Sequence, residues 1–131
     1  MATRMQGRRL FVTRWLPVIG YLAVIFGLSS IPQLQVPGSF QYRDKVAHLI
    51  EYGGLGLVAA RAARDTWPAS SAWLRASMLL LAVSAVGACD EKYQQWTPGR
   101  ESSVYDWAAD STGGSIAQVI ALIAARRDRA A

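Results

Sequence analysis

Long apolar blocks separated by short polar segments dominate this sequence, and nearly all charged residues lie between the blocks. About 17 to 25 helical residues span the hydrocarbon core of a bilayer, and the first and fourth blocks are long enough. The middle two are short, so we expect them to include flanking residues or to lie in a locally thinned bilayer. The pattern predicts an all-α polytopic membrane protein, a single domain over residues 1–131. Its four-transmembrane-helix bundle is expected at about residues 15–32, 45–63, 73–90 and 106–125.

Two alternative interpretations of the apolar blocks are a soluble helical protein and a cleaved signal peptide. Apolar runs of about 10 to 14 residues often form the buried core helices of a soluble protein. Here four blocks fill 131 residues and leave too little amphipathic surface to shield them from water. The first block follows Arg8, Arg9 and Arg14, as in a secretory signal peptide, but it is long for such a segment. We therefore expect an uncleaved first membrane helix.

Basic residues are concentrated on one predicted side of the membrane. Ten of the fourteen Lys and Arg residues precede the first block, lie in the central loop or follow the last block. Because Lys and Arg are enriched in cytoplasmic loops, both termini are predicted to be cytoplasmic. This orientation also explains the net charge of +5, so we expect no nucleic-acid partner. The ten residues are Arg4, Arg8, Arg9, Arg14, Arg61, Arg64, Arg75, Arg126, Arg127 and Arg129.

Acidic residues have the opposite distribution. Seven of the nine lie on or near the predicted outer side, while Asp65 and Asp128 lie on the inner side. Acidic residues contribute little to membrane orientation, so insertion does not require this asymmetry. We expect it to have a functional cause. The seven residues are Asp44, Glu51, Asp90, Glu91, Glu101, Asp106 and Asp110.

Polar residues recur at helical spacing around the start of the second block. Asp44, His48 and Tyr52 are four residues apart, and Glu51 follows His48 by three. Side chains three and four residues apart share one face of a helix. A charged side chain such as Glu51 within a membrane helix costs about 2.5 to 3.5 kcal/mol on insertion scales, so we expect it to face the bundle interior. Neighbouring glycines would let another helix approach this face closely.

A second polar segment begins at the end of the third block. It carries Asp90, Glu91 and Gln94, and continued helix would stack Asp90 on Gln94 because they are four residues apart. Arg100 follows a Pro-Gly turn. Its planar guanidinium is suited to bidentate hydrogen bonding with a carboxylate or phosphate, so this segment predicts an anion contact.

The fourth block opens with two acids on one helix face. Asp106 and Asp110 stand at i and i+4, and two negative charges at this spacing repel each other. Something must compensate them. The candidates are Lys45, His48, Arg100, a metal ion, or protonation of one acid.

Four ordered motifs between Asp44 and about Gly114 resemble those of the VanZ-like membrane proteins. The family motifs are Asp-Lys-x-x-His-x-x-x-Tyr, Asp-Glu-x-x-Gln, Pro-Gly-Arg and Asp-x-x-x-Asn-x-x-Gly. Position 110 departs from the family, which usually has Asn there, so a neutral hydrogen-bonding role is not expected of this acid. The matching residues here are Asp44, Lys45, His48 and Tyr52; Asp90, Glu91 and Gln94; Pro98, Gly99 and Arg100; Asp106, Asp110 and Gly113.

The VanZ-like family is named for a protein associated with resistance to the glycopeptide teicoplanin. The resemblance therefore implies a multi-pass protein of the bacterial cytoplasmic (inner) membrane with a link to the cell envelope. It does not imply an established reaction, so whether this chain is an enzyme stays open. The implied partners are a membrane lipid or a lipid-linked envelope precursor.

Residue chemistry assigns candidate roles. His48, Glu51 and Asp106 are the candidate catalytic residues, because imidazole and carboxyl groups can act as general acids and bases. A single histidine excludes a multi-histidine zinc site, whereas a carboxylate-rich divalent metal site stays open. We expect no resident cofactor, and we expect Cys89, at the end of an apolar block, to be buried. The candidate ligand-binding residues are Asp44, Lys45, Tyr52, Asp90, Glu91, Gln94, Arg100 and Asp110.

Two hypotheses for function follow. In the first, the polar residues bind or process an amphiphilic anionic envelope molecule, and Arg100→Lys or His48→Ala abolishes binding while stability stays near wild type. In the second, the chain is a non-catalytic membrane component in which His48 bridges helices, Arg100 anchors a loop and the outer loops dock a partner. A transporter is disfavoured because four short helices leave little room for alternating access unless the chain forms a homo-oligomer.

Overall fold

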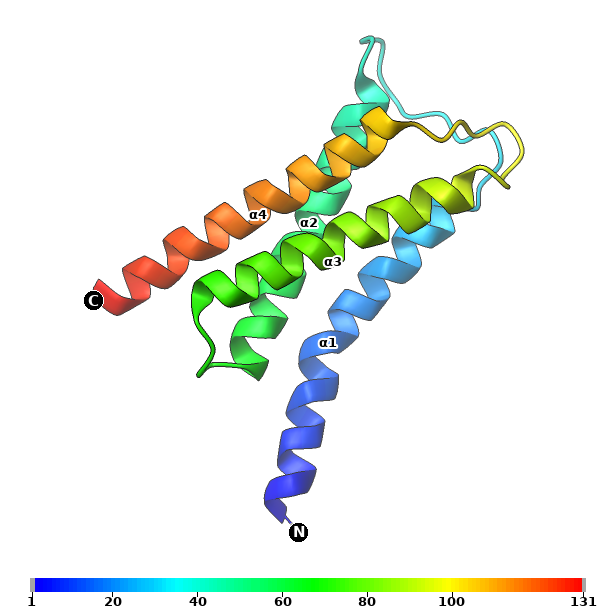
Figure 1. Cartoon of the computed structure of the whole chain (residues 1–131). Helices are drawn as coiled ribbons and strands as arrows, with labels where there is room; N and C mark the ends of the chain where they lie inside the picture. Colours follow the sequence, from blue (N-terminus) through cyan, green and yellow to red (C-terminus); the bar gives the residue numbers. More distant parts are fainter. Residues whose placement is uncertain (1, 131) are drawn as a thin grey trace.

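The computed structural model describes residues 2–130, including the side chains of residue 9 and residues 11–128. It contains four helices (Figure 1): α1 (Ala2–Ser29), α2 (Arg43–Thr66), α3 (Ala72–Gln94) and α4 (Val104–Ala130). The prediction of an all-helical chain with four helices is confirmed over the described residues. The helices are longer than expected, because α1 begins well before residue 15 and α3 continues past residue 90.

Local sequence explains several helix ends. α1 ends at Ser29, shortly before Pro32, and α2 ends two residues before Pro68. Proline disfavours continued helix because it has no backbone N–H and clashes with the preceding turn. At the start of α3, the Ser71 side chain accepts a hydrogen bond from the Leu74 nitrogen at 3.1 Å. This is the ordinary N-cap arrangement, which satisfies a backbone donor that the helix itself leaves unpaired.

The molecule has two distinct ends (Figure 1). The loops at residues 30–42 and 95–103 lie at one end, which we call the two-loop end. The two ends of the chain and the loop at residues 67–71 lie at the other, which we call the terminal end. At the two-loop end the Gln33 nitrogen donates a hydrogen bond to the Pro98 oxygen at 3.2 Å. The two loops are therefore joined to each other.

Helix α2 is the central helix of the fold. It packs against α1, α3 and α4, whereas α1 and α4 do not pack against each other over the described residues. Its closest partner is α4, where a Cβ atom at Gly113 would overlap the Leu49 carbonyl oxygen and lie 2.9 Å from the Gly53 nitrogen. Small residues permit such close backbone approach between membrane helices. Another helix does approach this glycine-containing face closely, as expected, and that helix is α4.

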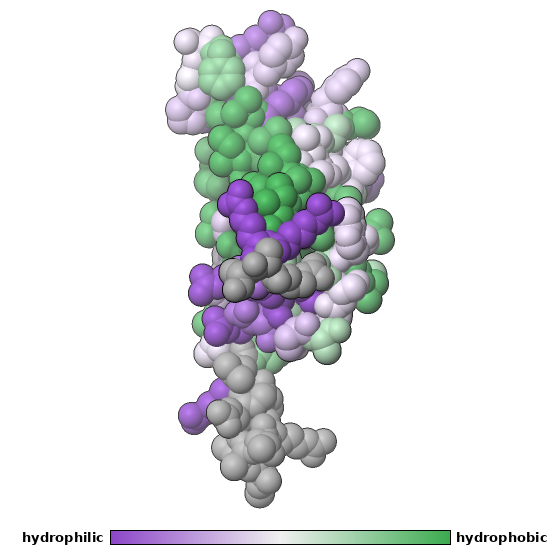
Figure 2. Space-filling model, turned by 90° about the vertical axis from the view of Figure 1, so that its left-hand side faces the viewer, coloured by the Kyte–Doolittle hydropathy of each residue, from purple (hydrophilic) through white to green (hydrophobic). Residues whose placement is uncertain are grey.

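Three helical segments in the described part of the chain are long and apolar enough to cross a membrane: Phe11–Ser29, Ala72–Gln94 and Val104–Asp128. Figure 2 shows a continuous hydrophobic area on the face it presents, between hydrophilic groups above and below. Water-soluble monomers rarely expose large contiguous apolar surface. These features support a membrane protein and disfavour the soluble alternative. Exposed apolar side chains on these segments include Ile19, Val24, Met78, Leu81 and Val119.

Helix α2 is long but less apolar than the other three. It has 24 residues and carries charged side chains along much of its length. Its position at the centre of the fold compensates for this composition, because its buried face, including His48 and Tyr52, packs against protein. Polar groups inside a membrane protein are tolerated where they face other helices.

Candidate functional site

The structure gathers most of the predicted site residues into one buried polar cluster at the two-loop end. These residues come from three helices, so none of the three polar segments of the sequence forms the cluster alone. Asp44 and Arg100 lie at its edge and are partly exposed. The polar cluster consists of Lys45, His48, Glu51 and Tyr52 of α2, Asp90, Glu91 and Gln94 of α3, and Asp106 and Asp110 of α4.

His48 is the centre of the buried contacts. Its Nδ1 atom lies 2.8 Å from Oδ1 of Asp110, at hydrogen-bond distance, and 3.9 Å from Oε1 of Glu91. The Asp110 side chain is fully buried, and those of His48 and Glu91 are exposed by only 10% and 7%. One imidazole thus connects α2 with acids from both α3 and α4. We call these three residues the buried triad.

Two features outside the predicted set position the triad. Asp110 packs against Gly87 of α3, where a Cβ atom would lie 2.8 Å from Oδ2 of Asp110. Glycine at this position therefore provides the space that the carboxylate occupies. The backbone nitrogen of Ser103, just before α4, donates a hydrogen bond to Oε2 of Glu91 at 2.7 Å. This bond fixes one oxygen of Glu91 and leaves the other facing His48.

Asp90 and Gln94 extend the cluster toward α1. The continued helix stacks them as expected, and Nε2 of Gln94 donates to Oδ2 of Asp90 at 3.1 Å. The same amide nitrogen lies 3.3 Å from the Ser29 hydroxyl at the end of α1. Tyr52 is fully buried beside Asp90, and its ring stacks over His48 with a centroid distance of 6.5 Å. α1 therefore joins the cluster through a serine that the sequence patterns did not single out.

Lys45 forms the most exposed part of the cluster. Its Nζ atom lies 2.8 Å from both Oδ2 of Asp44 and Oδ1 of Asp106. The hydrogen bond from Lys45 lowers the pKa of the Asp44 carboxyl below its usual range. Asp44 lies inside the first turn of α2, where a negative charge also interacts favourably with the helix dipole. Lys45 thus ties the start of α2 to the start of α4.

Arg100 is positioned by the turn that precedes it. Its backbone nitrogen donates to the Thr97 oxygen at 3.1 Å, and Gly99 has a φ of 74°, as the third residue of a type II turn requires. The guanidinium lies close enough to the Glu51 carboxylate for Coulomb attraction. Over the described residues it forms no ion pair, so its hydrogen-bonding capacity is left for another group.

Each of the two acids near the start of α4 has a different partner on α2. Asp106 pairs with Lys45, and Asp110 pairs with His48. The third candidate side chain, Arg100, pairs with neither acid. The physical reason is geometric, because Lys45 and His48 share the face of α2 that lies against α4, while Arg100 lies in the loop between α3 and α4.

The cluster remains acid-rich after these pairs are counted. Four buried carboxylate oxygens have no hydrogen-bond partner among the described residues, and they belong to Glu51, Asp90, Glu91 and Asp110. A buried acceptor without a partner is unfavourable, so a proton, cation or ligand is expected to satisfy some of these oxygens. A hollow of about 200 Å³ lies beside Glu91, lined also by Ser103 and Trp107. This hollow would allow access from the two-loop end.

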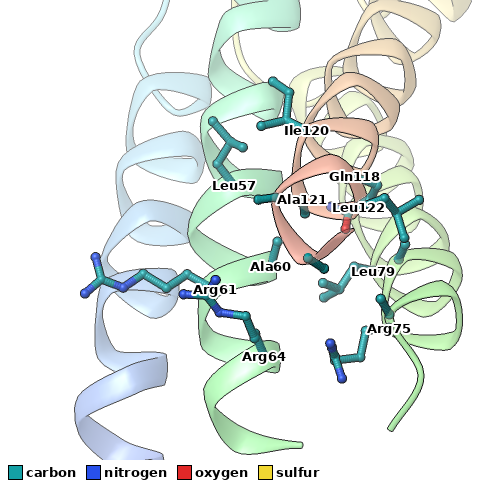
Figure 3. Close-up of a pocket in the computed structure, with 14 residues that line it drawn as sticks. Leu57, Ala60, Arg61, Arg64, Arg75, Leu79, Gln118, Ile120, Ala121 and Leu122 are labelled. Atoms are coloured by element: carbon teal, nitrogen blue, oxygen red, sulfur yellow. The ribbon is translucent and has the colours of Figure 1, made fainter. Parts of the chain in front are cut away.

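A second hollow, of about 210 Å³, lies between α2, α3 and α4 at the terminal end (Figure 3). Apolar side chains such as Leu57 and Leu79 line it, and three arginines stand at its margin. Figure 3 shows Arg61 extending toward α1, away from the hollow. Arg75 donates hydrogen bonds to the Trp67 oxygen at 2.9 Å and to Ser70. None of the predicted site residues lies here.

Sequence patterns did not predict three positions that support the cluster, and they predicted the wrong environment for one cysteine. Ser29, Gly87 and the Ser103 backbone were not predicted, although a glycine within an apolar helix is a signal of close packing. Cys89 is exposed, so the prediction that it is buried was wrong. It lies on the outward face of α3, where an apolar position contacts lipid as readily as protein. Composition cannot distinguish these two environments in a membrane.

Comparisons with protein-family models, curated proteins and solved structures found no match to this chain. The VanZ-like resemblance therefore stays a prediction that rests on the residues themselves. Three of its four motifs contribute side chains to the polar cluster, and the fourth, Pro98-Gly99-Arg100, forms the turn at its edge.

Proposed function

We propose that this chain is a VanZ-like membrane protein of the bacterial cytoplasmic membrane, with four transmembrane helices and both termini in the cytoplasm. The two-loop end, with the polar cluster, would face the outside. Two observations support this orientation: the arginines are concentrated toward the terminal end, and both ends of the chain lie there, as an even number of crossings requires. The side chains of Arg4, Arg8 and Arg129 lie outside the described residues.

The proposed activity is the binding of an amphiphilic anionic envelope molecule at the two-loop end. If the chain is an enzyme, it would also process this molecule. A lipid-linked phosphate or a peptidoglycan precursor has this chemistry. The observation that carries the proposal is Arg100, a guanidinium held by a defined turn beside the cluster and without an ion pair over the described residues. Such a group can offer two parallel hydrogen bonds to a phosphate or carboxylate.

The surrounding geometry supports an amphiphile as the bound molecule. Its charged head would meet Arg100, whereas the charge of Lys45 is already paired with Asp44 and Asp106. Its apolar tail could lie along the exposed apolar surface of the membrane helices. If the molecule is processed, His48 and Glu51 are the groups we propose for acid–base chemistry, with Asp106 keeping Lys45 in place.

Substitution of Arg100 tests this function most directly. Arg100→Lys keeps the positive charge and removes the planar fork, so we expect loss of the copurifying anionic lipid and a melting temperature near wild type. Mass spectrometry of lipids from native nanodiscs measures the first, and thermal unfolding the second. Arg43→Lys is the matched control, because it makes the same change at the first residue of α2, at the same end of the molecule. A wild-type lipid content in Arg100→Lys would overturn the proposal.

One observation favours the alternative, a non-catalytic membrane component whose cluster holds the bundle together. The contact between His48 and Asp110 joins α2 to α4 and is buried on both sides. A purely structural cluster predicts that Arg100→Lys leaves copurifying lipid unchanged, while substitution of either member of the buried pair unfolds the chain. Loss of the buried pair is destabilising under both functions, so the lipid content of Arg100→Lys is the measurement that separates them.

A further inference from the structure

The buried triad brings three metal-ligand atoms together. One ligand atom from each of His48, Glu91 and Asp110 lies within 4.8 Å of the other two. From Nδ1 of His48 the distances are 2.8 Å to Asp110 and 3.9 Å to Glu91. Two ligand atoms that bind one Zn²⁺ ion at about 2.0–2.2 Å stand roughly 3 to 4 Å apart. Small movements of these side chains would therefore enclose an ion.

Unpartnered oxygens give an independent indication of a missing cation. Oε1 of Glu91 and Oδ2 of Asp110 are buried and have no hydrogen-bond partner among the described residues. Oε1 of Glu91 is the atom that faces His48 Nδ1, so it points into the triad. The other oxygen of Glu91 is fixed by the backbone nitrogen of Ser103. The carboxylate is thus already oriented with one free oxygen toward the imidazole.

We propose that the buried triad binds a divalent transition-metal ion, Zn²⁺ or Mn²⁺. One imidazole and two carboxylates form a mixed nitrogen and oxygen site that suits both ions. The ion would replace the proton between His48 and Asp110 and would satisfy the free oxygen of Glu91. Three protein ligands leave a coordination position for water or for an oxygen of another molecule. The hollow beside Glu91 lies on the side from which that molecule could enter.

The surrounding charges favour a cation at this point. Asp90 and Glu51 are the other buried acids of the cluster, and each retains an unpartnered oxygen among the described residues. Their charges would attract a divalent ion from solution and offset the cost of its desolvation. The metal site does not depend on the anion proposed for Arg100, because Arg100 is not one of the three ligands.

Metal titration of the purified full-length chain tests the proposal. Chelator-treated protein in detergent is titrated with Zn²⁺ and, separately, Mn²⁺ by calorimetry, and bound metal is counted by mass spectrometry after desalting. We expect one ion per chain for at least one metal, and an affinity at least about 100-fold lower in Glu91→Gln and Asp110→Asn. Glu101→Gln and Asp128→Asn are the matched controls, since they make the same chemical changes at exposed positions outside the polar cluster. Arg100→Lys should bind the metal as wild type does, even if it loses the lipid.

The histidine provides a test that requires no variant to fold. Because His48 is the only histidine, its imidazole NMR signals can be followed without ambiguity. Binding of Zn²⁺ at Nδ1 should shift them strongly, and the shift should saturate with the calorimetric curve. Imidazole signals that stay unchanged at saturating Zn²⁺ would overturn a zinc site. Absence of both Zn²⁺ and Mn²⁺ binding in the wild type, or unchanged affinity in both triad variants, would overturn the proposal altogether.

Discussion

The two ends of this bundle treat charged side chains in opposite ways. At the two-loop end, Nδ1 of His48 lies 2.8 Å from Oδ1 of Asp110, and the two side chains are exposed by 10% and 0%. At the terminal end, the pair between Arg64 and Asp128 has a distance of 3.4 Å, with side chains exposed by 51% and 66%. The first end buries acids and leaves some of their oxygens unpartnered, whereas the second keeps its charges near solvent.

This difference indicates which charges need a functional explanation. The proposed membrane orientation would account for the arginines at the terminal end, and the pair between Arg64 and Asp128 lies where water can solvate both partners. Orientation does not require buried acids at the two-loop end, and burial makes them costly. The depth of a charge, rather than its presence in the sequence, therefore separates orientation signals from candidate sites.

The comparison depends first on which end faces the outside. We expect a membrane-impermeant thiol reagent to label Ser39→Cys fully in intact cells and to leave Ala69→Cys unlabelled, because these residues lie in loops at opposite ends. Both variants are made in a Cys89→Ser background, which is mild because Cys89 is exposed. Labelling at position 69 instead of position 39 would reverse the proposed orientation. Permeabilised cells provide the control, since both positions should then react.

Breaking one pair at each end tests the difference in burial. His48→Ala leaves the fully buried Asp110 without its partner, and we expect a loss of about 3 to 5 kcal/mol in the free energy of unfolding. This revises the expectation from sequence that stability stays near wild type. Asp128→Ala breaks an exposed pair and should cost no more than about 1 kcal/mol. Denaturant unfolding in detergent measures both, and equal losses would show that burial does not distinguish the two ends.

Glycine substitution tests the helix contact beneath the polar cluster. Gly113→Ala places a methyl group against the Leu49 carbonyl oxygen, so we expect α2 and α4 to separate at a cost of about 3 kcal/mol, the upper end for overpacking. Gly27→Ala is the matched control, because nothing lies within 4 Å of a Cβ atom there. It should be neutral or stabilising by up to about 1 kcal/mol, since alanine favours helix more than glycine does. Similar melting temperatures for the two variants would contradict the proposed role of this contact.

Much of the fold follows from local features of the sequence. The apolar blocks set the number of helices, and the four-residue spacing of polar groups correctly placed His48 with Tyr52 and Asp90 with Gln94. These patterns need only helical geometry, which the chain determines over a few residues. The helix bounds were less accurate, because Arg9 and other favourable helix formers extend α1 well beyond its apolar block.

The partners within the site could not be predicted in the same way. Whether Asp110 meets His48 or Arg100 depends on the rotation of α4 against α2, and the contact of Gly113 with Leu49 and Gly53 joins parts of the chain that are far apart in sequence. The support from Gly87 and Ser103 likewise comes from other parts of the chain. Cys89 shows a further limit, because a membrane helix is apolar on both its lipid face and its protein face.

The two acids that pair with Lys45 differ in burial but not in their distance from the lysine nitrogen. Asp44 and Asp106 hold the same Lys45 nitrogen at 2.8 Å, but their side chains are exposed by 47% and 9%. We expect Asp106→Asn to cost about 1 kcal/mol and Asp44→Asn less than about 0.5 kcal/mol, because solvent screens the exposed pair. Both free energies of unfolding are measured at neutral pH in the same detergent. Because Lys45 lowers the pKa of folded Asp44, that small contribution is complete at neutral pH and is lost as the pH falls through the lowered value. Equal losses in the two variants, or a larger loss for Asp44→Asn, would show that depth does not govern the charges at this end of the bundle.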